Sequence, residues 1–105
     1  MREFVKVAQI GEPWPVRMKL VVADGEHILL ARIDGQYHAV ADDCTHAGCS
    51  LSDGALQGRV VLCPCHGSQF DVTTGKVITG PASRALAQYT VKIQGPDIFV
   101  GPGYP

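Results

Sequence analysis

Two apolar runs on either side of an Asp-Gly dipeptide constrain the fold of this chain most strongly. The runs are His27 to Ile33 and Gln36 to Ala41, and Asp34-Gly35 separates them. This dipeptide supplies the positive φ angles that a type I′ turn needs at both of its central positions. The pattern therefore predicts a β-hairpin, and with it an antiparallel sheet.

Short runs of β-branched and aromatic residues recur elsewhere between clusters of Gly, Pro and Asp, and no long helical period competes with them. We expect about eight or nine strands in an antiparallel all-β domain. Beyond the hairpin, the predicted strands are Phe4 to Gln9, Arg17 to Val22, Arg59 to Leu62, Leu86 to Gln94 and Asp97 to Val100, with a turn at Gly95 and Pro96.

The alternation of side chains near the C-terminal end predicts which of them are buried. Tyr89, Val91 and Ile93 share one face by the two-residue period of a strand, so they should face the core. Thr90 and Lys92 should then face water.

The length and charge of the chain limit the functions that it can serve. Its 105 residues fit one domain, residues 1-105, and leave no room for a second catalytic domain. The formal charge of -1 lacks the basic excess of a nucleic-acid-binding surface. The N-terminal segment has no secretory apolar core, and no apolar run approaches the roughly 18 to 20 residues of a membrane span. We therefore expect a cytoplasmic protein without a membrane anchor.

All four cysteines lie in two short segments, in or beside the loops expected over Asp42 to Gly54 and Pro64 to Ser68. The first is Cys44-Thr45-His46-Ala47-Gly48-Cys49 and the second is Cys63-Pro64-Cys65-His66-Gly67-Ser68. They contain Cys-x-His and Cys-x-x-His, with 16 residues between His46 and Cys63. Two loops at the same end of a sheet could thus present two thiolates and two imidazoles to one site.

This arrangement resembles the signature of Rieske proteins, in which Cys-x-His is followed by Cys-x-x-His at a similar separation. The likeness covers Asp43 to about Val100 and is weaker before it. The flanking segments resemble the small Rieske ferredoxins of bacterial oxygenase systems. These segments are Ser50-Leu51-Ser52-Asp53-Gly54, Gly67-Ser68-Gln69-Phe70-Asp71-Val72, Thr74-Gly75-Lys76-Val77 and Gly80-Pro81-Ala82.

The resemblance implies a Rieske domain, with an antiparallel β-sandwich base and a small inserted cluster-binding subdomain at about residues 43-82. It implies one 2Fe-2S cluster, with Cys44 and Cys63 on the buried iron and His46 and His66 on the outer iron. Two neutral imidazoles in place of thiolates leave the oxidised cluster formally neutral, so an added electron costs less. The potential is then roughly -150 to +300 mV, against about -400 mV for plant-type clusters. Reduction should also raise the affinity of the histidines for protons.

Three further residues bear on the properties of such a cluster. Ser68 matches a serine that donates a hydrogen bond to a bridging sulfide in the high-potential relatives, which favours the reduced form. Phe70 stands where those relatives often have a tyrosine, and it has no hydroxyl to donate to a ligand sulfur. We expect a potential between those of the two groups. Ala47 replaces a larger apolar residue that meets a quinone in cytochrome-complex subunits, so we do not expect quinone contact.

Cys49 and Cys65 match cysteines that form a disulfide between the two cluster loops in the Rieske subunits of cytochrome complexes. The resemblance implies the same bridge here, which would stabilise the fold by about 3 kcal/mol in the chain-entropy model. The alternative is two buried thiols, because the cytoplasm is reducing.

By the same resemblance, the chain is a one-electron carrier and not itself an enzyme. A flavin-dependent reductase would reduce it, and it would dock through His46, His66 and Pro81 against a terminal oxygenase. One alternative is an electron-transfer subunit of a larger oxidoreductase complex. Another is a structural zinc site, although such sites usually pair Cys with Cys and His with His. His27 and His38 are expected to be strand residues with no ligand role.

Overall fold

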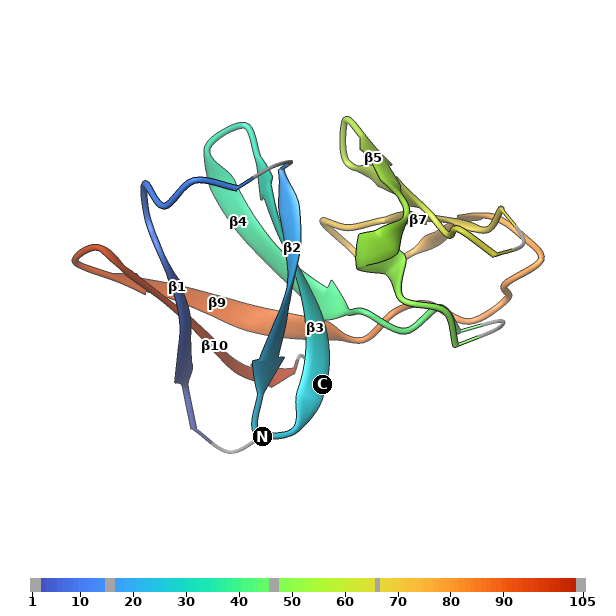
Figure 1. The fold of residues 1–105 in the computed structure, drawn as a ribbon. Coiled ribbons are helices and arrows are strands. Elements are labelled where there is room, and N and C mark those ends of the chain that lie inside the picture. The colour runs from blue at the N-terminus through green and yellow to red at the C-terminus, as the bar shows by residue number, and fades with distance from the viewer. Residues whose placement is uncertain (1–2, 15–16, 46–47, 66, 104–105) are drawn as a thin grey trace.

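The structure is a computed structural model that describes residues 3-14, 17-45, 48-65 and 67-103 (Figure 1). Over these residues it has ten strands, against the eight or nine predicted, and one short 3-10 helix, Leu51–Asp53. The described residues contain no helix that is long and apolar enough to cross a membrane. The strands are β1 (Val5–Gln9), β2 (Met18–Ala23), β3 (Glu26–Ile33), β4 (Gln36–Ala41), β5 (Ala55–Gln57), β6 (Val60–Leu62), β7 (Gln69–Asp71), β8 (Val77–Thr79), β9 (Gln88–Gln94) and β10 (Asp97–Gly103).

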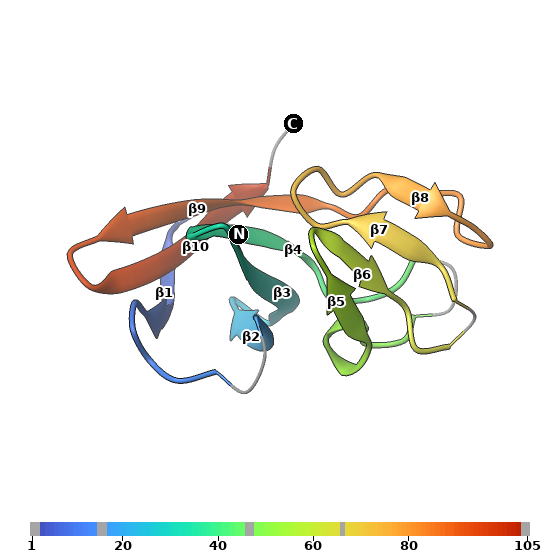
Figure 2. The same ribbon diagram turned by 90° about the horizontal axis from the view of Figure 1, so that it is seen from above.

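Six strands form one antiparallel sheet, which we call the base, in the order β1-β10-β9-β4-β3-β2. The sheet curls so that its two edge strands, β1 and β2, contact each other. This curvature gives the base two layers around a core of its own, seen from above in Figure 2. The predicted antiparallel all-β fold is confirmed.

The other four strands form a smaller antiparallel sheet in the order β5-β6-β7-β8, which lies beside the base in both ribbon views. The chain enters this sheet after β4 and returns to the base at β9. Strands β4 and β9 pair directly, with Ala39 opposite Tyr89 and Val40 opposite Gln88. The small sheet is therefore an insertion between two neighbouring strands of the base.

Two Asp-Gly turns fix the register of strands β2, β3 and β4. Asp34 and Gly35 have φ angles of 51° and 79°, which is the type I′ geometry predicted from the sequence. Asp24 and Gly25 have nearly the same angles, 52° and 77°, between β2 and β3. The same dipeptide signal identifies this second turn.

The burial of β9 differs from the strict alternation that we predicted. Tyr89 and Val91 pack against the core of the base. Ile93 is 45% exposed, because β4 pairs with β9 only at Gln88 and Tyr89, and Ile93 therefore lies on an edge of the sheet. Thr90 is half-buried, and its hydroxyl donates to the Pro102 carbonyl oxygen at 2.9 Å. The position along the hairpin thus decides burial as much as the face of the strand does.

Strand β3 contributes to two hydrophobic cores, one on each of its faces. Ile28 and Leu30 face the core inside the base, whereas Leu29 and Ala31 face a second core between the base and the small sheet. This explains why these four consecutive residues are apolar, since a strand covered on both sides needs no alternation. We call the second one the junction core; it also contains Val40, Leu51, Val61, Phe70, Val72 and Leu86.

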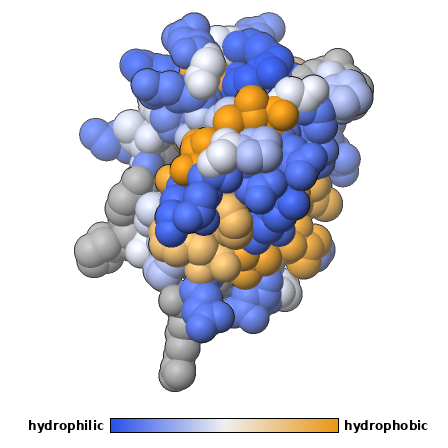
Figure 3. All heavy atoms as spheres, turned by 90° about the vertical axis from the view of Figure 1, so that its left-hand side faces the viewer, coloured by the Kyte–Doolittle hydropathy of each residue, from blue (hydrophilic) through white to orange (hydrophobic). Residues whose placement is uncertain are grey.

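The end of the base that lies farthest from the small sheet faces the viewer in Figure 3. Hydrophobic residues there form small groups between hydrophilic ones. Close to this end, Trp14 packs edge-on against Tyr37, with ring centroids 5.9 Å apart, and the Lys19 ammonium lies 5.7 Å from the Trp14 ring. The indole ring therefore covers part of the core of the base.

Candidate metal centre

The predicted metal ligands fall into two groups in the structure. Cys44 and Cys63 are described, and their exposed fractions are only 3% and 2%. Both belong to the junction core, beside the inserted sheet. His46 and His66, like Ala47, lie outside the described residues. Over the part of the chain that is described, no three His, Cys, Asp or Glu side chains gather into a metal site.

The first loop, residues 42-54, closes on itself immediately around Cys44. The backbone N–H of Cys44 donates to the Cys49 carbonyl at 2.9 Å, and that of Gly48 donates to the Cys44 carbonyl at 2.7 Å. One step further out, Asp43 and Ser50 form an isolated antiparallel bridge. Cys44 and Cys49 are thus joined by a backbone hydrogen bond at the end of a paired stem.

The second loop connects β6 to β7 and has a similar closure. The backbone N–H of Cys63 donates to the Ser68 carbonyl at 2.8 Å, and Gly67 adopts a positive φ of 77°. Gly54 brings the two loops together, because a Cβ atom at this position would overlap the carbonyl oxygen of Leu62. Only glycine allows the first loop to pass this close to the end of β6.

The Cys44 and Cys63 side chains meet inside the protein, although they come from different loops. Burial raises the pKa of the Cys63 thiol; the backbone N–H of Cys65 lowers it, and the neighbouring Cys44 thiol raises it again, so that the pKa lies above its usual value. Neither cysteine belongs to a disulfide. Two apposed buried sulfurs suit a soft metal cation, which binds thiolates and displaces their protons. This part of the donor set fits an iron-sulfur cluster.

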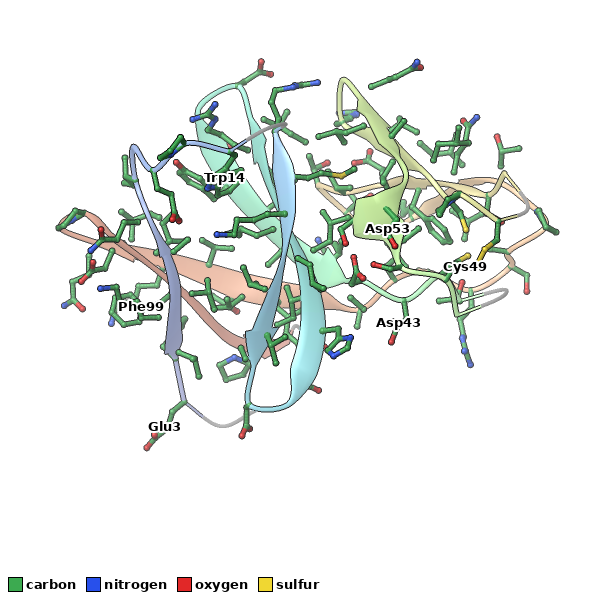
Figure 4. All side chains as sticks on the ribbon, in the orientation of Figure 1. Glu3, Trp14, Asp43, Cys49, Asp53 and Phe99 are labelled. Carbon is green, nitrogen blue, oxygen red and sulfur yellow. A yellow bond between two sulfur atoms is a disulfide. The ribbon has the colours of Figure 1, made fainter. Side chains whose placement is uncertain are left out.

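The structure joins Cys49 and Cys65 in a disulfide, with Cα atoms 6.4 Å apart. Cys49 lies in the first loop and Cys65 in the second, so the bridge links the two loops. It lies at the end of the molecule away from the base (Figure 4). The pairing is the one that the resemblance implied.

A third loop, residues 80-87, is hydrogen-bonded to both of the others. The backbone N–H of Ala82 donates to the buried Ser68 hydroxyl oxygen at 3.0 Å. The Thr45 hydroxyl donates to the Arg84 carbonyl at 2.6 Å. The Gly80-Pro81 peptide bond is cis, and both residues are exposed. Because the Ser68 oxygen accepts this hydrogen bond from Ala82, the Ser68 hydroxyl can still donate its own hydrogen to a bound group.

One of these connections, between Thr45 and Arg84, could not be predicted from the sequence. The resemblance drew attention to Ser68 and Pro81, but Thr45 and Arg84 carried no signal of their own. Their contact joins residues 39 positions apart in the chain. A hydroxyl-to-carbonyl bond of this kind depends on how two irregular loops fold, for which neither periodicity nor spacing gives a rule.

The Rieske [2Fe-2S] domain family matches residues 3–90 of the chain. The chain is 35% identical over 80 residues to the ferredoxin component of a naphthalene 1,2-dioxygenase system of Pseudomonas aeruginosa, covering 76% of this chain and 77% of that protein. It is 37% identical over 98 residues to the biphenyl dioxygenase ferredoxin subunit of Pseudomonas sp. (strain KKS102), covering 92% of this chain and 90% of that protein.

The fold is also similar to that of a ferredoxin in a solved complex of reduced oxygenase and oxidized ferredoxin of carbazole 1,9a-dioxygenase. The TM-score is 0.86 and the identity is 31%, over 93% of this chain and 92% of that one. The family match and these relatives support a Rieske 2Fe-2S cluster rather than the structural zinc that the sequence left open as an alternative. The chain belongs to the Rieske [2Fe-2S] domain family, and it is an electron-transfer protein rather than an enzyme.

Proposed function

We propose that this protein delivers single electrons to a terminal oxygenase from a 2Fe-2S cluster held by Cys44, His46, Cys63 and His66. The observation that carries the proposal is the meeting of two buried thiols on two loops that a disulfide joins. The relatives named as ferredoxin components of dioxygenase systems support the same role. Residues 43-82 act as the cluster-binding subdomain in this proposal.

A Rieske cluster supplies one-electron chemistry at a potential above that of four-cysteine clusters. The described residues of this chain prepare the site for it. The junction core excludes water from the Cys44 and Cys63 sulfurs, and the disulfide limits the separation of the two loops. Ser68 is completely buried and is oriented by the Ala82 N–H, so its hydroxyl can donate to a sulfide and favour the reduced form.

The third loop offers the described part of a docking surface. Pro81 and Arg84 are exposed there, beside the Thr45 contact to the first loop. We include His46 and His66 in this surface, because histidine ligands on the outer iron shorten the path of the electron to a partner. The ferredoxin of the carbazole 1,9a-dioxygenase complex binds an oxygenase. We propose an oxygenase as acceptor and a flavin-dependent reductase as donor; the cytoplasmic location stays a prediction.

One observation favours a second function, that of a Rieske subunit in a larger oxidoreductase complex. The Cys49–Cys65 disulfide is the feature that the resemblance connects with cytochrome-complex subunits. A solved Rieske protein of the cyanobacterial plasma membrane has 29% identity and a TM-score of 0.76. The rate of electron transfer to an isolated oxygenase distinguishes the two functions, since a subunit of a larger complex would reduce the oxygenase slowly or not at all.

The decisive experiment is electron paramagnetic resonance of the dithionite-reduced protein, with iron, sulfide and zinc assayed in the same sample. We expect two irons and two sulfides per chain and a spectrum with the low average g value of mixed His and Cys ligation. Cys63→Ser should lose this spectrum, whereas Asp53→Asn, at an exposed aspartate of the first loop, should keep it. A silent sample that contains zinc would overturn the proposal.

A further inference from the structure

We propose that Asp42 is a positioning residue whose buried carboxylate holds the first loop in place and lowers the reduction potential of the cluster bound there. This inference rests on the proposed function, because it requires Cys44 to be a cluster ligand. The sequence alone does not distinguish this side chain from the neighbouring acids Asp43 and Asp53 and favours a solvated loop face for all three, but Asp42 is buried.

Asp42 lies where the chain leaves the base and enters the first loop. Its backbone N–H donates to the His27 carbonyl of β3 at 3.1 Å, and its own carbonyl accepts from the Leu51 N–H at 2.7 Å. Only 1% of the residue is exposed. Asp42 is thus anchored to the base on one side and to the far arm of the loop on the other.

The carboxylate of Asp42 binds the far arm of the loop through two residues. One oxygen accepts from the Ser50 hydroxyl, and the other accepts from the Ser52 backbone N–H at 2.9 Å. The two serine hydroxyls are 2.9 Å apart, so they form one small polar network with the acid. Ser50 also forms the bridge to Asp43 and follows Cys49 in the chain. The network therefore clamps the stem from which Cys44 projects.

The partners of this carboxylate are hydroxyl and amide groups. In the described part of the chain, the ion pairs involve other acids: Asp71 pairs with Arg59, Asp97 with Lys6, and Glu12 with Lys19. Among the described residues, the carboxylate of Asp42 is thus stabilised by hydrogen bonds and not by a cation. Burial keeps it away from water, so its field is weakly screened.

A buried negative charge beside a redox centre opposes the arrival of an electron. Asp42 is two positions from Cys44, and its network includes Ser50, the neighbour of Cys49 in the paired stem. Asp43 is closer to Cys44 in the chain, but it is exposed, and its side chain points away from the protein in Figure 4. Solvent screens the charge of Asp43, which makes this residue a matched control.

The test is redox titration of the intact, cluster-loaded protein, followed by electron paramagnetic resonance. Asp42→Asn removes the charge, keeps an oxygen for the Ser52 N–H, and gives Ser50 an amide partner. At a fixed ambient potential, we expect it to raise the ratio of reduced to oxidised cluster about tenfold, or about 59 mV for one electron. Asp43→Asn should change the ratio less than twofold, and both variants should keep the g values of the unmodified protein.

An unchanged ratio in Asp42→Asn would overturn the inference, whatever its effect on melting temperature. If this variant does not retain the cluster, Ser50→Ala provides a second test of the inference. It keeps the charge but removes one donor, so the ratio should fall; a ratio that rises or stays constant would overturn the inference. Failure of the proposed function is distinct, because the unmodified protein would then lack the Rieske spectrum before any variant is made.

Discussion

Asp71, at the end of β7, is a buried acid with partners unlike those of Asp42. Its carboxylate accepts from the Thr73 N–H at 2.8 Å and from the Thr73 hydroxyl at 2.6 Å, and Arg59 Nε lies 3.2 Å away. Burial alone would raise its pKa, but the Thr73 bonds, the Arg59 charge and the Thr74 N–H together lower it. The carboxylate therefore stabilises the turn between β7 and β8 only while it is ionised.

The lowered pKa of Asp71 predicts that the folded protein loses stability in acid. Because the pKa is lower in the folded protein, the contribution is complete above the ordinary Asp value of about 4 and disappears as the pH falls through the folded value. Asp71→Asn should lower the free energy of unfolding at pH 7 by about 1-3 kcal/mol. Urea titrations should show the difference from the unmodified protein shrinking below about pH 4.

Asp53→Asn serves as the control for this prediction, because Asp53 is exposed. It should leave the free energy of unfolding nearly unchanged across the same pH range. A deficit of Asp71→Asn that persists unchanged in acid would contradict the role assigned to the charge.

At the scale of elements, the longer strands of the base could be predicted from the sequence and the strands of the insertion mostly could not. Gln36–Ala41 was predicted with its observed bounds, because a type I′ turn and apolar alternation agree there. β5, β7 and β8 were missed: each has three residues, too few to display a period. These short strands are stabilised by tertiary packing, in which Phe70 belongs to the junction core and Leu56 packs against it.

For the site as well, some features could be predicted from the sequence and others could not. The spacing of Cys and His pointed to a metal, and the family resemblance pointed to the cluster and to the pairing of Cys49 with Cys65. The hydrogen bonds that orient the loops, such as those of Asp42, join residues whose types are common in any loop. Their roles follow only from burial and from the approach of distant segments.

The disulfide is the element-scale feature that chemistry can test most directly. If the protein is denatured without reductant and alkylated, mass spectrometry should find Cys44 and Cys63 labelled and Cys49 and Cys65 unlabelled. The double variant Cys49→Ser with Cys65→Ser should lose about 3 kcal/mol of stability in the chain-entropy model. It should also lose its cluster faster when heated, because the two loops can then separate. Labelling of both Cys49 and Cys65 would refute the bridge.

For the whole molecule, the two cores make different contributions to stability and to the site. The core of the base is shared among its own six strands, whereas the junction core contains Cys44 and Cys63 beside residues of β2, β3 and β4. Damage to either core should destabilise the fold. Only damage to the junction core should act directly on the metal centre.

Leu29 and Leu30 allow this difference to be measured with adjacent residues of one strand. Both are completely buried, Leu29 in the junction core and Leu30 in the core of the base. Replacement of either by Ala should cost about 2-5 kcal/mol of stability. Leu29→Ala should in addition accelerate cluster loss, followed by visible absorbance under conditions in which both variants remain folded. Equal rates of loss would show that the two cores are not distinct in this respect.

The direct pairing of β4 with β9 has a consequence for how this architecture can change in evolution or in the laboratory. The inserted segment leaves and rejoins the base at adjacent points, so residues added to its loops displace no strand of the base. The entropy of closing a longer loop grows only slowly with its length. We therefore expect insertions and deletions in the loops of the inserted sheet to leave the register of the larger sheet unchanged.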